Sequence, residues 1–136
     1  IPITEGAYDA HYRIDLDHIL MPTFASFRDA SAQLGTLLHE AAHATGAKHR
    51  LDRNFAERFK RDSLAIEEIC AELTASFVLA DLGIAHHPRA DHAAYVASWL
   101  RALKDDPRAI FTAASKAQAA ADWMHAQQPQ PEEIAA

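Results

Sequence analysis

The chain has 136 residues, enough for one domain with a hydrophobic core, and 49% of them are hydrophobic and 24% charged, as in ordinary soluble proteins. Its net charge of −6 argues against a nucleic-acid-binding surface over the whole domain. The sequence has no apolar run near the ~18 residues of a membrane span, and its single Cys70 excludes an internal disulfide. We therefore expect a cytoplasmic protein without a signal peptide.

Residues 1–22 alternate apolar and polar side chains, a pattern typical of β-strands. The segment from Arg13 to Asp17 can turn, which predicts a short hairpin that ends at Pro22. One long strand is the alternative. Residues 23–29 then form a connector. The apolar positions of the pattern are Tyr8, Tyr12, Ile14, Leu16, Ile19 and Met21.

A helix is predicted over residues 31–47, because apolar side chains recur through it at helical spacing. Asp29 or Ser31 can cap its start, and Gly46 can end it.

The most informative stretch of this helix is His39-Glu40-Ala41-Ala42-His43, in which two histidines lie four residues apart. Positions i and i+4 share one face of a helix, so both imidazoles can bind a single ion. Glu40 lies about 100° around the helix from His39, which lets it reach a water at the open side of the ion without binding the ion itself. This arrangement is typical of zinc hydrolases.

Residues 48–62 are dense in charge, with more basic than acidic side chains. One interpretation is a local basic patch for a polyanion. The interpretation we favour is a solvated loop beside the metal site.

A second long helix is predicted from Ser63 to Leu82, ended by Gly83. It is apolar over most of its circumference and is therefore expected to be buried. Glu68 and Glu72 share its apolar stripe, one turn apart, where they repel each other and lose hydration.

A metal ion with its histidines would offset this cost, so Glu68 and Glu72 compete as the third ligand. We assign Glu68 to the metal and expect Glu72 to accept a hydrogen bond from the far ring nitrogen of a ligand histidine. The reverse assignment stays open, as does pairing of both carboxylates with arginines of residues 48–61. Glu67 is expected to face solvent.

Two further helices are predicted, one capped by Asp91 that runs to Lys104 and one that starts at Asp106-Pro107. Small residues on the last helix predict a closely packed seam made of Ile110, Ala114, Ala117, Ala121 and Met124. The other histidines, expected in loops or at the surface, are His49, His86, His87 and His92.

The predicted elements give an α+β fold, mostly α, with a small N-terminal β-hairpin or sheet and about four helices. We expect residues 1–126 to form one domain and residues 127–136 a polar tail. Because the chain begins at Ile1, we expect it to be the C-terminal part of a longer protein. Cys70 lies off the carboxylate stripe and is expected in the core.

Most of the chain resembles one family, the zincin-like metallopeptidase domain of ArdC-type antirestriction proteins and TraC-type plasmid primases, also found in polyvalent proteins. The resemblance runs from about Tyr8 to Met124. It is carried by residues 10–12, 17–22, 36–46, 50–53, 58–59, 67–73, 95–100 and 110–117. Ala41 and Ala44 depart from the bulkier residues common in the family.

The resemblance implies that His39, His43 and Glu68 bind the metal and that Glu40 is the general base. It also implies a preceding domain that binds single-stranded DNA. Zinc is the expected cofactor, although manganese or another divalent ion suits such ligands too.

Three functions fit the pattern. The first is a peptidase that hydrolyses a protein or peptide substrate through a metal-activated water. The second is a metal-stabilised binding module that acts in antirestriction or single-stranded DNA protection without cleavage. The third is a purely structural metal site with four protein ligands. Tyr12 is a candidate acid or oxyanion donor for the peptidase.

Overall fold

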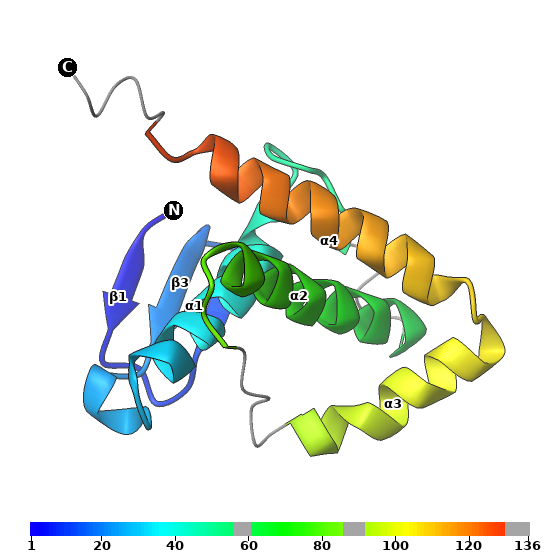
Figure 1. Ribbon diagram of the computed structural model, residues 1–136, viewed down its shortest axis with the longest axis horizontal. Coiled ribbons are helices and arrows are strands. Elements are labelled where there is room, and N and C mark those ends of the chain that lie inside the picture. The colour runs from blue at the N-terminus through cyan, green and yellow to red at the C-terminus, as the bar shows by residue number, and fades with distance from the viewer. Residues whose placement is uncertain (56–60, 86–91, 130–136) are drawn as a thin grey trace.

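The computed structural model describes residues 1–55, 61–85 and 92–129, with side chains for 63–85 and 97–129 in the two later ranges. In these residues, three short strands are followed by four α-helices (Figure 1). The predicted α+β, mostly helical class is thereby confirmed. No helix of this described part is both long and apolar enough to cross a bilayer.

The sheet has the order β1-β3-β2, formed by β1 (Ile3–Glu5), β2 (His11–Arg13) and β3 (His18–Met21). β2 and β3 pair antiparallel, which confirms the predicted hairpin. β1 pairs with β3 in parallel, a strand the hairpin prediction did not include. Tyr8, part of the predicted strand pattern, instead lies fully exposed between β1 and β2.

One face of the sheet packs on α1 (Ala30–Thr45). The shared core consists of Tyr12, Ile19, Met21 and Ala44. The helix starts at Ala30, one residue before the predicted start, because Asp29 of the two candidate caps is its N-cap and accepts a 2.8 Å hydrogen bond from the N–H of Ala32. The sheet therefore fixes α1 from one side.

On its other side α1 packs against α2 (Arg61–Asp81), which also packs against α4 (Ala109–Ala126) (Figure 1). Fully buried alanines line both α2 and α4, among them Ala71 and Ala113, and they let the two helices lie close together. A short 3₁₀ helix, η1 (Phe24–Ser26), precedes α1, and α3 (His92–Asp105) leads into α4.

The predicted seam on α4 is shifted around the helix. Ala117 and Ala121 are buried as predicted, but Ile110, Ala114 and Met124 are only partly buried. The helix begins two residues after Pro107, and Ala109, Ala113 and Ala120 are also buried.

Candidate metal centre

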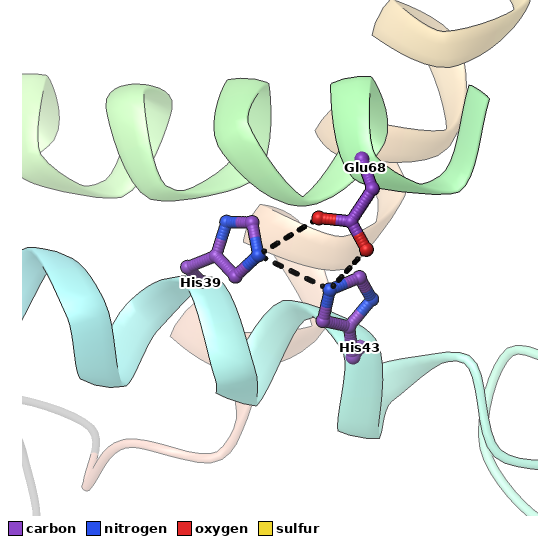
Figure 2. Close-up of side chains that lie close together, drawn as sticks. All are labelled: His39, His43 and Glu68. Carbon is purple, nitrogen blue, oxygen red and sulfur yellow. Dashed lines mark hydrogen bonds and ion pairs between the residues drawn. The ribbon is translucent and has the colours of Figure 1, made fainter. Parts of the chain in front are cut away.

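Two helices bring three ligand-capable side chains together between them. His39 and His43 project from α1, one turn apart, and Glu68 projects from α2 toward both (Figure 2). Each histidine is only 3% exposed. His39 Nε2 lies 3.2 Å from His43 Nε2 and 3.3 Å from Glu68 Oε2, and His43 Nε2 lies 3.4 Å from Glu68 Oε1.

The other ring nitrogens show which atoms carry protons. His39 Nδ1 lies 2.6 Å from Glu72 Oε1, and His43 Nδ1 lies 3.1 Å from Glu67 Oε1. A nitrogen this close to a carboxylate oxygen must carry a hydrogen, since two lone pairs would repel each other. With the Nδ1 atoms protonated, a neutral imidazole presents its Nε2 lone pair to the cluster. Two such lone pairs and a carboxylate facing one another suit a cation between them.

The spacing fits a divalent metal. Nitrogen and oxygen ligands that bind zinc tetrahedrally at ~2.0–2.1 Å are separated from one another by about 3.3–3.4 Å. The 3.2 Å between the two Nε2 atoms is close to this value, and each Nε2 lies 3.3–3.4 Å from a different oxygen of the Glu68 carboxylate. In the part of the chain that the structure describes, this cluster contains three ligand side chains. Catalytic zinc sites have three protein ligands and a water in the fourth position, whereas closed structural zinc sites have four protein ligands.

Glu40 follows His39 on α1 but stands outside the cluster of ligand atoms. Its Oε2 accepts a 2.8 Å hydrogen bond from the main-chain N–H of Tyr12 on β2, and the residue is 6% exposed. The Glu40 carboxylate is therefore buried and tied to β2, and Glu40 directly follows a residue of the cluster in the chain.

A sequence model of one protein family, described as zincin-like metallopeptidase, matches residues 1–116. The chain belongs to this family. Its zincin-like fold is shared with the antirestriction protein ArdC of plasmid R388, whose metal-free crystal structure has 46% sequence identity and a TM-score of 0.79 over 91% of this chain. The manganese(II)-bound crystal structure of ArdC has 44% identity and a TM-score of 0.80 over 92% of this chain.

Two curated proteins are also similar in sequence to this zincin-like chain. Protein y4eC of Sinorhizobium fredii is 56% identical over 94% of the chain, and DNA primase TraC of Escherichia coli is 42% identical over 90% of it. The chain spans only 42% of y4eC, 8% of TraC and 45% of metal-free ArdC. The relatives therefore contain long regions that this zincin-like chain does not represent.

Charge in the zincin-like centre is balanced by short contacts. Burial lowers the pKa of His43, but hydrogen bonds to Glu67 and Glu68 outweigh it and raise the pKa to about 9. Burial likewise raises the pKa of Glu68, but hydrogen bonds from His39 and His43 outweigh it, and the pKa falls well below its usual range. Without a metal, a proton on His43 would thus offset part of the carboxylate charge.

The prediction that Glu67 faces solvent is wrong. Glu67 is 9% exposed, and it accepts hydrogen bonds from His43 Nδ1 and from Arg53. Glu67 therefore contacts Nδ1 of His43 in the same way that Glu72 contacts Nδ1 of His39. The helical pattern of residues 63–82 gave no sign of this role, because Glu67 falls among polar positions and its partner Arg53 comes from a loop.

The prediction of a solvated charged loop is also wrong for its two central arginines. The Arg53 side chain is 4% exposed and pairs with Glu67. The Arg50 side chain is 9% exposed and forms a bidentate ion pair with Asp17, both bonds 2.7 Å long. Neither is available to a polyanion, and neither pairs with Glu68 or Glu72 as the alternative had it. Residues 56–60 of the loop lie outside the described part.

The other residues considered in the sequence analysis do not join the three-residue cluster in the described part of the chain. The Tyr12 hydroxyl donates a 2.8 Å hydrogen bond to Asp17, so it is engaged away from the three ligands. His49 is largely exposed and lies 3.3 Å from Asp17. His86, His87 and the side chain of His92 are outside the described residues. Cys70 is fully buried in the core as predicted, where burial raises the pKa of its thiol to about 11.

Proposed function

We propose that this zincin-like domain is a metal-dependent peptidase within an antirestriction-type protein of a plasmid or phage. The observation that carries the proposal is the convergence of two Nε2 atoms and one carboxylate at 3.2–3.4 Å, with both Nδ1 atoms turned toward other carboxylates. Histidines that merely filled a core would not need to direct both lone pairs at one point.

In this proposal His39, His43 and Glu68 hold the ion, and Glu72 orients His39. The bound ion would supply Lewis acidity, which polarises the scissile carbonyl and lowers the pKa of water. Glu40 takes the proton from the attacking water and passes it to the leaving amine. Zinc or manganese suits two imidazoles and a carboxylate, and the ArdC relative was crystallised with manganese(II).

The relatives suggest the setting of the activity. One is named an antirestriction protein and another a DNA primase, and each extends well beyond the part that this chain matches. We infer that residues 1–126 act as one domain beside another that contacts single-stranded DNA. A free, buried Cys70 suits the cytoplasm as the place of action.

A second candidate is a metal-stabilised binding module that cleaves nothing. It is favoured by the burial of the ligands, since His39 and His43 are each 3% exposed, and by a relative named for antirestriction and not for proteolysis. The case for a module that binds DNA directly is weaker, because Arg50 and Arg53 both form internal ion pairs.

The variant Glu40→Gln separates the two candidates. Its amide keeps the size of the side chain but accepts no proton. We expect it to bind metal as the wild type does and to hydrolyse an unfolded protein, such as casein, at least ~100-fold more slowly. Full hydrolysis by the variant would refute the role of Glu40. A metal-loaded wild type that cleaves nothing, in a protein whose antirestriction effect survives Glu40→Gln, would favour the binding module.

A further inference from the structure

Arg53 joins the two helices that carry the ligands. Its Nε and Nη2 donate to the two carboxylate oxygens of Glu67, over 3.1 and 2.8 Å. Nη2 also donates to the carbonyl of Ala42 over 2.6 Å, and Nη1 donates to Thr45 Oγ1 over 2.7 Å. One guanidinium thus ties the last turn of α1 to the carboxylate that accepts the Nδ1 proton of His43.

The backbone around Arg53 is shaped to bring the guanidinium to this position. Its neighbours Asp52 and Asn54 both have left-handed conformations, with φ of 47° and 38°. Asp and Asn tolerate this region better than most residues, although it still costs energy. At Gly46 an added Cβ would lie 2.8 Å from Arg53 Nη2 and 2.6 Å from Phe55 Cζ. Glycine therefore leaves the space that the guanidinium occupies.

The charge of Arg53 matters because Glu67 is buried beside other carboxylates. Glu67 is 9% exposed, and its Oε1 lies 3.1 Å from His43 Nδ1 and 2.8 Å from Arg53 Nη2. Arg53 provides the positive charge on the side away from the ligands. Without it, Glu67 would face Glu68 across His43 with one fewer cation to compensate it.

We propose that Arg53 is a positioning residue of the metal centre, which acts through Glu67 to hold the His43 ring in its ligand orientation. The inference rests on the proposed function, since it assigns Arg53 a role in binding the same ion. It predicts that metal affinity depends on a side chain that contacts neither the ion nor a ligand directly. Partners behind ligand histidines typically contribute 10–100-fold to metal affinity.

The chain offers a matched control in Arg50. It comes from the same loop, is similarly buried, forms a bidentate ion pair and donates to the carbonyl of Ala44 on α1. Its partner Asp17 lies behind no ligand. Arg53→Gln and Arg50→Gln therefore each remove a bidentate ion pair of a buried arginine, and only the first pair adjoins the centre, although Asp17 is more exposed than Glu67.

The experiment measures cobalt(II) binding by chelator competition, together with the visible absorption that reports cobalt geometry, in the wild type and both variants. We expect Arg53→Gln to bind about 10–100-fold more weakly with an altered spectrum. Arg50→Gln should bind within twofold of the wild type. The double variant Arg53→Gln/Glu67→Gln leaves no unpaired buried charge, so it should regain stability but not affinity.

The possible outcomes test the positioning role of Arg53 separately from the proposed metal-dependent function. A wild type that binds no cobalt overturns the proposed function itself. If the wild type binds cobalt and Arg53→Gln matches it in affinity and spectrum, the positioning role is wrong while the metal site stands. An equal loss of affinity in Arg50→Gln, or a double variant that regains full affinity, would show a general effect on stability and would also overturn the role.

Discussion

The main-chain N–H of Tyr12 donates a 2.8 Å hydrogen bond to the Glu40 carboxylate, which joins the edge strand β2 to helix α1. This hydrogen bond positions one carboxylate oxygen of Glu40 through the main chain of Tyr12, without its side chain. The same residue directs its hydroxyl to Asp17. Tyr12 therefore supports the candidate base through its main chain and a separate ion pair through its side chain.

We expect Tyr12→Phe to keep hydrolysis within about twofold of the wild type, because the N–H that holds Glu40 remains. Stability should fall by about 1 kcal/mol through loss of the hydrogen bond to Asp17. Steady-state kinetics and urea unfolding measure the two effects. A hundredfold loss of kcat in a folded, metal-loaded Tyr12→Phe protein would instead assign the hydroxyl a direct role in the reaction.

Metal binding should release a proton at neutral pH. Without metal, the pKa of His43 is raised from 6.5 to about 9, so its ring is protonated at pH 7 and must lose that proton to bind an ion. Calorimetric titration in buffers of different ionisation enthalpy should show release of about one proton per ion at pH 7. Binding without any proton release would contradict this charge state.

The same shift sets the pH dependence of the metal-free protein. A folded pKa above the unfolded one adds stability that is fully present below pH 6.5 and is lost as the pH rises toward about 9. We expect the metal-free wild type to lose stability over this interval in urea unfolding, and a variant with His43→Gln to lose less of it.

Gly46 lacks a Cβ atom and so leaves room for the side chains of Arg53 and Phe55. Gly46→Ala should destabilise the fold by about 1–3 kcal/mol, because its Cβ meets Phe55 and Arg53. If Arg53 moves, metal affinity should fall as well. Gly83→Ala is the control, since its Cβ meets nothing and its cost, ~1–2 kcal/mol, comes from a φ of 68° alone. Equal effects of both variants on metal affinity would contradict the steric account.

Local signals predicted much of the fold. The N-cap at Asp29 and the apolar spacing after it predicted α1, and the alternation before Pro22 predicted the hairpin. Each of these signals acts within a few residues. The stripe of Glu68 and Glu72 on an apolar helix face pointed to the carboxylates that now lie against the histidines. Their roles in binding metal stay predictions.

The sequence patterns could not predict contacts between residues far apart in the chain. Glu67 falls among the polar positions of its helix, yet it is buried in contact with His43 of α1 and Arg53 of the loop. Asp52 and Asn54 on either side of Arg53 were the available signal, since such residues favour left-handed turns. The parallel pairing of β1 likewise depends on a connection that no alternation pattern records.

The most direct measurement is the amount and affinity of divalent ion bound per chain, by elemental analysis after dialysis against zinc or manganese. We predict one ion per wild-type chain, binding about 10–100-fold weaker in Glu72→Gln, and the greatest loss in Glu68→Ala. A wild type that retains no ion, or a Glu68→Ala protein that binds it as tightly as the wild type, would contradict the metal centre described here.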